Sequence, residues 1–524
     1  MLKLLEHCLS LTDDFIGTMT KTERKKIGQF FTSPVTAKFM AGLFDIPDKA
    51  VLKVLDAGAG SGILSAALME RLDSIESIEC VNLICYELDE NVLPLLEDTL
   101  AYISQHVHFK LIYEIHRENF ITSQEHAFKE KKHLFQADIC IGNPPYKKIS
   151  KIAEEAIAMP EVCHGAPNLY FLFAAMSLFD LAKGGEMVYI IPRSWTSGAY
   201  FKAFREYLLK NGSIDHIHLF VSRDKVFASE SVLQETIIVK IRKTQHQSDT
   251  ITITSSDDSG FSDLNRMVLP TNNVIFGDNQ YVYLITTPEE ARLLRTMQEF
   301  TQTLPSIGLK MKTGLTVDFR ERDQVCDECK DGTVPLFFAQ HIQNAKLIHP
   351  IGKAGEWIRQ TKKGLIQKNS NYLFIKRFTS KEEPRRLQCG IYLEEYFPDY
   401  DVISTQNKIN FIDNKGHNMS KETVYGLFVL FNSTMYDRFY RILNGSTQVN
   451  STEVNTMPVP EMVAINSMGH HLMMNGNLST ESCDTILEEY INAKIEGCQK
   501  ATRGYWNAET TAARDVLPDT TCAV

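Results

Sequence analysis

Residues 137–146 read ADICIGNPPY, a short apolar run followed by an Asn-Pro-Pro-Tyr tetrad. Residues 139–141 have the length of a buried strand, which ends at Gly142. Two consecutive prolines donate no N–H and hold φ at about −65°, so they form a stiff extended loop instead of continuing the strand. The sequence therefore places Asn143 and Tyr146 at the carboxyl end of a strand, where open α/β sheets bind their ligands.

This tetrad suits a planar substrate that carries an amino group. The Asn143 side-chain carbonyl and the Pro144 main-chain carbonyl can each accept one amino hydrogen. The Tyr146 ring can stack on the face of the substrate. Because four residues are a short pattern, a proline turn with a capping asparagine is the competing interpretation, and the rest of the chain has to discriminate.

The tetrad resembles the catalytic motif of methyltransferases that use S-adenosylmethionine to modify an exocyclic or amide nitrogen, chiefly N6 of adenine in DNA. The resemblance assigns catalytic roles to Asn143, Pro144 and Tyr146. It also implies that Phe227, within KVFASESVLQETIIV, is a second aromatic that packs on a flipped target base. A buried core aromatic is the alternative interpretation of Phe227.

A glycine loop follows the predicted strand at residues 51–55 and reads DAGAGSG. Alternating glycines allow a tight turn and a close approach of the backbone to a ligand. The leading acid, Asp56, suits a cationic or amine-bearing ligand better than a diphosphate, and S-adenosylmethionine carries a sulfonium and an α-ammonium group. The sequence therefore predicts an S-adenosylmethionine site that includes Asp56, Gly58, Gly60 and Gly62.

Further cofactor contacts are expected at the ends of the next strands. Glu87 ends the strand at residues 81–86, where an acid can accept both ribose hydroxyls. The strand at residues 109–115 leads to Asn119 and Phe120. In the resembled family, an Asp that contacts the cofactor adenine commonly occupies the Asn119 position. The segment GQFFTSP resembles the family's lead, which holds the methionine carboxylate, and this assigns Phe31, Thr32 and Ser33 to the site together with Asn143. From the residues alone, Ser33-Pro34 predicts the start of a helix.

Strands and helices alternate through residue 241, which predicts a seven-stranded, doubly wound, Rossmann-like α/β methyltransferase domain. The strand at residues 236–241 is expected at an antiparallel edge or in a hairpin. We predict a lead at 1–27, the catalytic domain at 28–244, and a mixed α+β target-recognition domain with a helical tail at 245–524. A polar stretch, HQSDTITITSSDDSG, motivates the last boundary.

The region 301–390 contains sixteen Lys/Arg and nine Asp/Glu, although the whole chain has a net charge of −10. Basic residues alternate with aromatics at 357–363 and 372–378, a pattern typical of a phosphate-facing surface, although a solvated basic face is equally compatible with any single residue. Residues 444–450, NGSTQVN, resemble a stretch near the C-terminus of type II adenine methyltransferases, in the region that carries target recognition. These features predict double-stranded DNA as the partner.

Composition narrows the remaining possibilities. No apolar run is long enough to span a membrane and no signal pattern appears, so we expect a soluble intracellular protein, and the family resemblance implies a bacterial, cytoplasmic one. The eleven cysteines are scattered and suggest reduced, packed thiols. The pair Cys326 and Cys329 lacks a second pair at zinc spacing, so no metal is expected.

The order of lead, glycine loop, tetrad and recognition region is similar to that of the gamma-group adenine methyltransferases of type II restriction-modification systems. The resemblance implies a monomeric enzyme that protects DNA from a separately encoded restriction endonuclease. Two alternatives stay open: a glutamine-N5 protein methyltransferase and a modification subunit of a multisubunit complex. A third, a DNA-binding module without activity, is disfavoured by the intact Asp56, Glu87, Asn143 and Tyr146.

Overall fold

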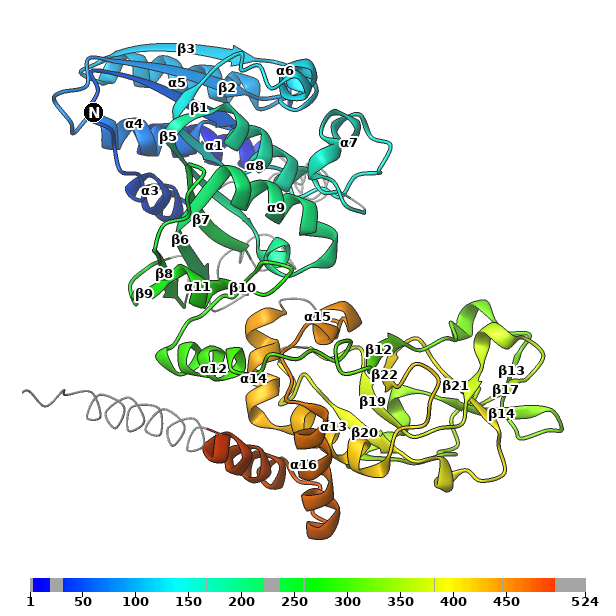
Figure 1. Ribbon diagram of the computed structural model, residues 1–524. Coiled ribbons are helices and arrows are strands. Elements are labelled where there is room, and N and C mark those ends of the chain that lie inside the picture. Colours follow the sequence, from blue (N-terminus) through cyan, green and yellow to red (C-terminus); the bar gives the residue numbers. More distant parts are fainter. Residues whose placement is uncertain are drawn as a thin grey trace, which may run out of the picture. The chain divides into compact units, whose positions relative to one another are not determined.

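The computed structural model describes residues 3–18, 32–165, 167–220, 236–257, 260–380, 382–444 and 447–494 of the 524-residue chain. The chain divides into two compact units, whose elements are labelled in Figure 1. The first unit comprises Met1–Arg292 and Ile442–Gly445, and the second comprises Leu293–Arg441 and Ser446–Val524. Each unit has its own sheets and its own hydrophobic clusters.

The first unit is built on a nine-stranded sheet of order β3-β2-β1-β4-β5-β7-β6-β8-β9. β1, β2, β3, β4 and β5 pair in parallel, β7 is antiparallel to both β5 and β6, and β8 is parallel to β6 and antiparallel to β9. The strands are β1 (Val51–Ala57), β2 (Cys80–Tyr86), β3 (Lys110–His116), β4 (Ala137–Gly142), β5 (Leu181–Pro192), β6 (Gly212–Phe220), β7 (Thr236–Lys243), β8 (Thr250–Ser256) and β9 (Asn265–Pro270).

The predicted alternation of strands and helices is confirmed through β7, but two details differ. The hairpin alternative for β7 is confirmed, since β7 is antiparallel to β6, the strand described before it, but the edge alternative is wrong, because β7 also pairs with β5. The polar stretch that motivated a boundary at 244/245 forms β8, so the sheet continues past that point. In β8, Ile251 and Ile253 are buried, while threonines occupy the alternate positions; this short alternation within a polar segment is a strand signal.

Helices pack in two groups against this sheet. One group contains α1 (Leu4–Thr18), α3 (Pro34–Gly42), α4 (Ile63–Leu72) and α5 (Leu93–His106), and the other contains α6 (Glu125–Glu130), α7 (Glu154–Ala158), α8 (Leu169–Asp180) and α9 (Lys202–Asn211). α1 belongs to the first unit and not to a separate lead, because Leu4, Leu5 and Cys8 are buried in its main cluster. The Cys8 thiol donates to the Ser61 carbonyl oxygen at 3.3 Å, which ties α1 to the glycine loop.

Two smaller sheets form the β part of the second unit. The first has the order β12-β22-β19-β20-β16-β15 and the other has the order β13-β17-β14-β21-β18. Their strands are β12 (Lys310–Thr313), β13 (Val325–Cys326), β14 (Thr333–Phe337), β15 (Ile342–Gln343), β16 (Lys346–Leu347), β17 (Trp357–Arg359), β18 (Gln367–Lys368), β19 (Tyr372–Lys376), β20 (Cys389–Tyr392), β21 (Val402–Thr405) and β22 (Ile409–Asp413). The first unit also contains β10 (Ile275–Phe276) and β11 (Tyr281–Val282), and α12 (Pro288–Gln298) spans the boundary between the two units in sequence.

The helices of the second unit follow β22 in sequence and include α13 (Lys421–Asn432), α15 (Ser451–Asn455) and α16 (Met462–Asn475), followed by a helix described over residues 480–494. α13 and α16 approach so closely that each needs a glycine. A Cβ built on Gly426 would lie 1.9 Å from the carbonyl oxygen of Ile465, and a Cβ on Gly469 would lie 1.8 Å from that of Glu422. The mixed α+β composition predicted for the C-terminal part is confirmed.

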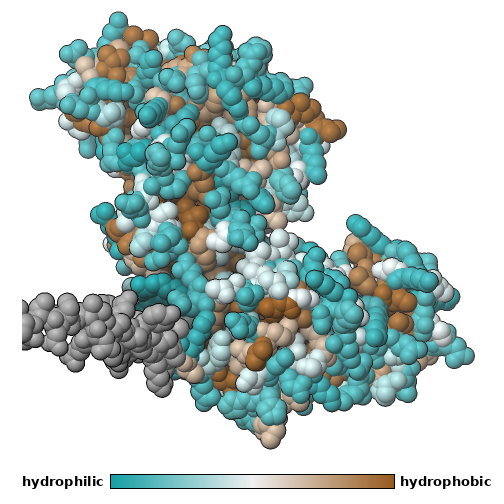
Figure 2. All heavy atoms as spheres, viewed as in Figure 1, coloured by the Kyte–Doolittle hydropathy of each residue, from teal (hydrophilic) through white to brown (hydrophobic). Residues whose placement is uncertain are grey.

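The surface is mainly hydrophilic on the face seen in Figure 2, with small separate hydrophobic patches. Within the described ranges, none of the helices combines the length and the apolar character needed to cross a bilayer. This agrees with the sequence pattern, in which no long apolar run occurs.

We expect Gly469→Ala to destabilise the second unit, because the added methyl can be accommodated only if α13 and α16 separate. Overpacking of this kind costs on the order of 1–3 kcal/mol. Calorimetric unfolding should show a transition lowered by several degrees. The matched control is Gly17→Ala on α1, where a Cβ meets nothing within 4 Å and helix propensity favours alanine. Equal unfolding temperatures for Gly469→Ala and wild type would contradict the backbone contact.

Candidate active site

A cavity of about 230 Å³ opens at the carboxyl ends of β1, β2 and β4 in the first unit. It brings together residues from four predicted motifs: the lead, the glycine loop, the acid after β2 and the tetrad. Its lining is Thr32, Gly58, Ala59, Gly60, Ser61, Ile63, Leu64, Tyr86, Glu87, Leu88, Glu118, Phe120, Asn143, Pro144, Pro145 and Phe173. The glycine loop and the tetrad are thus parts of one site.

The glycines of the loop divide into two roles. Gly58 and Gly60 line the cavity with φ of 75° and 57°, a left-handed backbone that other residues rarely adopt. Gly62 does not line it. A Cβ on Gly62 would lie 3.1 Å from both Leu96 and Thr99, so this glycine allows α4 to begin close against α5.

Asp56 lies at the end of β1 behind the cavity wall, and it is fully buried. The Ser65 hydroxyl donates to its Oδ2 at 2.6 Å, while Oδ1 has no hydrogen-bond partner among the residues that the structure describes. Burial, assisted by the negative charge of Glu87, raises the pKa of the Asp56 carboxyl to about 7. Its assignment to the cofactor remains a prediction, since it does not reach the cavity surface.

Glu87 is 8% exposed, and its carboxylate is held by main-chain donors. Its Oε2 accepts from the Gly60 N–H at 2.9 Å, and its Oε1 accepts from the N–H groups of Leu88 and Asp89, both at 2.8 Å. Glu87 therefore links the loop after β2 to the glycine loop after β1. A carboxylate has enough lone pairs to accept further hydroxyl hydrogens from the cavity side.

Of the two cofactor contacts predicted after β3, Asn119 and Phe120, only one lies at the cavity. Phe120 lines the cavity, but Asn119 does not. Asn119 Oδ1 accepts from the N–H groups of Ile121 and Thr122 at 3.0 and 3.3 Å, and its Nδ2 donates to Glu155 at 2.9 Å. The Asn119 side chain is thus used to hold the following turn against α7.

The acid that does line this wall is Glu118, one residue earlier. We did not predict Glu118, and we also missed Leu88 and Phe173. The sequence does contain a signal for Leu88, because this residue directly follows Glu87. In the structure Leu88 is 56% exposed in spite of being apolar. Phe173 lies on α8, and its place opposite the glycine loop depends on how that helix packs.

The lead residues have distinct places. Thr32 lines the cavity, whereas Ser33 is the N-cap of α3, where its Oγ accepts from the Thr36 N–H at 3.2 Å. The predicted helix start at Ser33-Pro34 is confirmed. Phe31 lies outside the described residues, and so does Phe227.

The tetrad is held by hydrogen bonds at both ends of the Asn143 side chain. Its Nδ2 donates to Thr32 Oγ1 at 3.1 Å, and its Oδ1 lies 2.8 Å from the Tyr146 hydroxyl, which donates. The same hydroxyl lies 3.0 Å from the carbonyl oxygen of Ile190 on β5, and burial raises the Tyr146 pKa. The Tyr146 ring packs edge-on against Tyr170, with centroids 6.3 Å apart. Asn143 therefore has a defined orientation beside the cavity.

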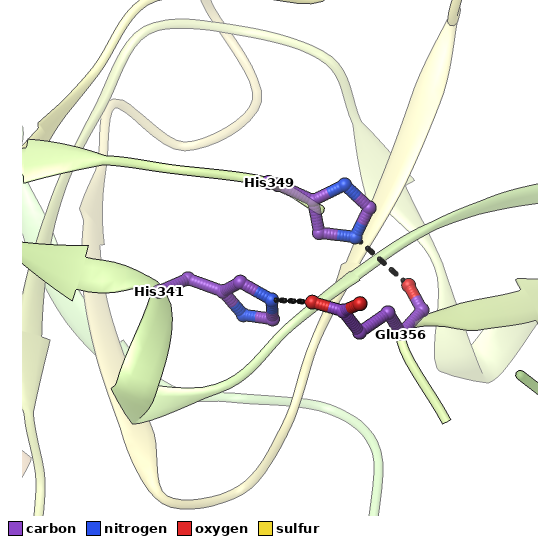
Figure 3. Close-up of side chains that lie close together, drawn as sticks. All are labelled: His341, His349 and Glu356. Atoms are coloured by element: carbon purple, nitrogen blue, oxygen red, sulfur yellow. Dashed lines mark hydrogen bonds and ion pairs between the residues drawn. The ribbon is translucent and has the colours of Figure 1, made fainter. Parts of the chain in front are cut away.

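A separate group of titratable side chains lies in the second unit, where His341, His349 and Glu356 have potential ligand atoms within 4.8 Å of one another (Figure 3). His341 Nδ1 accepts from the Phe338 N–H at 2.7 Å, so the ring proton is on Nε2, which donates to Glu356 Oε1 at 2.6 Å. His349 Nε2 faces the Glu356 carbonyl oxygen at 2.9 Å and is protonated, because a carbonyl oxygen can only accept.

Glu356 in this group also accepts from the N–H groups of residues 351, 352 and 353. Burial opposes its ionisation, but the Ile351 N–H and the His341 ring hold the Glu356 pKa below its usual value. Because both histidine Nε2 atoms donate and the carboxylate is fully used, the group pins a loop and does not offer a metal a set of lone pairs. Cys326 and Cys329 are not members of this group.

The sheet of the first unit defines the class of the protein. The order β3-β2-β1-β4-β5-β7-β6 with an antiparallel β7, a glycine turn after β1 and a cavity at the carboxyl ends constitute a class I methyltransferase fold. A profile of the family described as Eco57I restriction-modification methylase matches residues 78–227.

Two known type II methyltransferases are similar to this protein over most of the chain. The type II methyltransferase M.BsuBI of Bacillus subtilis is 35% identical over 479 residues, with coverage of 89% of this chain and 94% of that protein. M.PstI of Providencia stuartii, also a type II methyltransferase, is 30% identical over 495 residues, with coverage of 92% and 95%. The chain belongs to this family of type II restriction-modification methyltransferases.

Among solved structures, the type IIL restriction-modification enzyme MmeI in complex with DNA aligns with a TM-score of 0.49 and 12% identity, covering 89% of this chain and 68% of that one.

The raised pKa of Asp56 predicts a pH dependence of stability. A carboxyl whose folded-state pKa is raised stabilises the fold fully below its unfolded value near 3.8, and this contribution is lost as the pH rises through about 7. Asp56→Asn should therefore gain stability relative to wild type as the pH rises from about 4 to about 8. Thermal unfolding of the ligand-free protein across this range measures the difference. Asp98→Asn, at an exposed site on α5, is the control, and parallel curves for wild type and Asp56→Asn would refute the assignment.

Proposed function

We propose that this protein transfers a methyl group from S-adenosylmethionine to N6 of an adenine flipped out of double-stranded DNA, and that it thereby protects the site from a separately encoded restriction endonuclease. The observation that carries the proposal is that Asn143 and Pro144 line the same cavity as Gly58 and Gly60. An amine acceptor and a cofactor-sized, glycine-walled space are thus adjacent. Membership of the type II methyltransferase family supports DNA as the substrate.

The lining of the cavity fits S-adenosylmethionine. Glu87 would accept from ribose hydroxyls, and the apolar side chains of Leu88 and Phe120 would contact the adenine ring. The buried carboxyl of Asp56, with its Oδ1 lacking a partner in the described parts of the chain, would supply negative potential for the cationic end when it is ionised, at a pH above its pKa of about 7. When bound, the cofactor supplies an electrophilic methyl group on its sulfonium.

The amine of adenine is a weak nucleophile, because its lone pair is delocalised into the ring. Asn143 Oδ1 and the Pro144 carbonyl oxygen would each accept one amino hydrogen, which favours a pyramidal nitrogen and stabilises the positive charge that develops on it. Asn143 Oδ1 accepts from the Tyr146 hydroxyl, and an amide oxygen has two lone pairs, so the same atom can accept from two donors. The Thr32 hydroxyl, which accepts from Asn143 Nδ2, would help to hold the amide beside the substrate.

The target nitrogen is inaccessible inside a duplex, so the base must leave the stack, at a cost of a few kcal/mol. The Tyr146 ring, held by its hydroxyl between Asn143 and Ile190, would provide a rigid surface for the extruded base. Phe227 is proposed as the second aromatic contact. Orientation of this kind can account for roughly 7–11 kcal/mol of the barrier reduction.

Asn143→Ala should lower kcat by about 10²- to 10³-fold, since it removes one preorganised acceptor from the transition state. Equilibrium binding of S-adenosylmethionine should change by no more than a few-fold. Single-turnover methylation of plasmid DNA and isothermal titration calorimetry measure the two effects. Asn265→Ala, at an exposed position on β9, is the control and should match wild type. Methyl transfer by Asn143→Ala at the wild-type rate would overturn the role of Asn143.

Tyr146→Phe separates stacking from amide orientation. The ring remains but the hydroxyl no longer orients Asn143, so kcat should fall by about tenfold, as expected for one hydrogen bond worth roughly 1–1.5 kcal/mol. Tyr146→Ala should lose the stacking surface too and fall further. Steady-state kinetics on methylatable DNA distinguish the two variants. Equal activity of Tyr146→Phe and Tyr146→Ala would show that the ring contributes nothing.

The chemical identity of the product tests the proposal as a whole. Expression in a bacterial host without its own DNA methyltransferases, followed by nucleoside mass spectrometry and single-molecule sequencing, should reveal N6-methyladenine at one recurring sequence. Methylated cytosine, or methylated glutamine in host protein with unmodified DNA, would refute it.

A further inference from the structure

Most aromatic rings in the two basic stretches of the second unit, residues 357–363 and 372–378, are buried. Trp357 is 9% exposed, and Tyr372 and Phe374 are buried in the sheets. β17 and β19 are buried over most of their length, and the basic residues Arg359 and Lys376 stand at their ends. Phe378, just after β19, is different, because it is 45% exposed.

Arg377, beside Phe378, joins three chain segments. Its N–H donates to the carbonyl oxygen of Lys408 at 2.9 Å, and its Nη1 donates to that of Asn407 at 3.0 Å. Its Nη2 donates to Gln448 Oε1 at 3.3 Å, and the Val449 N–H donates to the Arg377 carbonyl oxygen at 2.7 Å. Gln448 lies in the NGSTQVN stretch singled out above.

A fourth segment, the loop after β12, is tied to the same place. The Asn407 N–H donates to the carbonyl oxygen of Thr316 at 2.8 Å, and Gln406 Nε2 donates to Asp318 Oδ1 at 3.1 Å. The residue after Asp318 is Phe319, which is 62% exposed. Four segments distant in sequence thus form one hydrogen-bonded surface, which we call the Arg377 face; it consists of Phe319, Arg320, Arg377, Phe378, Asn407, Lys408 and Gln448.

The Arg377 face pairs cations with exposed aromatic rings. The guanidinium carbon of Arg320 lies 5.6 Å from the centroid of Phe319, and that of Arg377 lies 5.6 Å from the centroid of Phe378. Planar arginine and phenylalanine groups together offer charge to phosphates and flat apolar surface to bases or sugars.

The face is also positively charged, in a protein of net charge −10. Arg320, Arg377 and Lys408 form no ion pair with any residue in the described ranges. Of the neighbouring acids, Asp318 accepts from Gln406 within this surface, and Glu321 pairs with Lys362 at 2.7 Å. Three cations thus remain available to an anionic partner.

We propose that the Arg377 face is a surface on which the second unit contacts duplex DNA, and this inference rests on the proposed function. Arg320, Arg377 and Lys408 contact backbone phosphates, and Phe319 and Phe378 contact the sugars or bases between them. Asn407, half-buried at the centre, offers a side-chain amide of the kind that pairs with a base edge in the major groove.

The test is the binding of a fluorescently labelled duplex of randomised sequence to the full-length protein, measured by anisotropy at several salt concentrations. Arg320→Ala/Lys408→Ala should weaken binding about 10- to 100-fold. It should also reduce the slope of log affinity against log salt by roughly 0.9 for each phosphate that the variant no longer neutralises. Phe378→Ala should weaken binding about fivefold or more without changing the slope, because stacking carries no counterion term.

Matched controls lie elsewhere on the second unit. Tyr396→Ala removes an aromatic ring of similar exposure, 46%, and Arg359→Ala/Lys346→Ala removes two exposed cations. Both should bind DNA within twofold of wild type. Calorimetric binding of S-adenosylmethionine to every variant checks that the first unit is intact, and circular dichroism checks folding.

The outcomes separate the inference from the proposed function. If the variants of the Arg377 face bind the duplex as well as their controls do, or if wild type does not bind it at all, the inference is overturned. Detection of N6-methyladenine in host DNA tests the proposed function independently, since methylation can be observed even if substitutions in the Arg377 face do not change DNA binding. Selective loss of binding with the predicted change in salt slope supports the face.

Discussion

The parallel register of β1 with β4 is the constraint on which the candidate active site depends. Asp56 on β1 is paired with Ile141 on β4. Two residues after each of these positions come Gly58 and Asn143, and both line the cavity. The hydrogen bonds of one strand pair thus set the distance between the proposed cofactor loop and the proposed catalytic amide. A shift of register would separate them, which is why the chemistry depends on an uninterrupted parallel core.

A second set of contacts gives the site its rigidity. Glu87 bonds to Gly60 and so couples the loop after β2 to the loop after β1. Thr32 and Tyr146 hold the two ends of the Asn143 amide. The donors and acceptors come from the lead, from β5 and from the tetrad itself, and each would have to move for Asn143 to turn. Preorganised acceptors of this kind contribute most when no reorganisation is needed during the reaction.

In the second unit, buried polar groups also hold neighbouring segments by hydrogen bonds, and there they determine where the loops lie. Glu356, in the group with His341, accepts hydrogen bonds from three consecutive main-chain N–H groups and from a histidine ring. Arg377 bonds to main-chain carbonyl groups of a distant turn. Small sheets with two- to five-residue strands have little core of their own, so such hydrogen-bonded side chains define where their loops lie.

Several features of the structure could be predicted from sequence patterns that have a local physical cause. The glycine turn after β1, the end of β4 at two prolines and the Ser33 cap of α3 all follow from backbone conformation at single residues, and each can be located in the sequence. The alternation of strands and helices through β7 could also be predicted, because apolar residues recur with a different period in strands and in helices. What the sequence determined alone is therefore the class of fold and the set of motifs at the edge of its sheet.

Tertiary structure decided which of the nearby residues face the cavity. Asn119 and Glu118 are adjacent, and only the direction of the chain after β3 uses the first to hold the following turn and makes the second part of the wall. Packing likewise places Gly62 against α5, buries Asp56 and adds β8 and β9 to a sheet that we expected to end at β7. The Arg377 face is assembled from four distant segments. Side-chain direction and long-range pairing depend on contacts between residues far apart in the chain, and no local pattern encodes them.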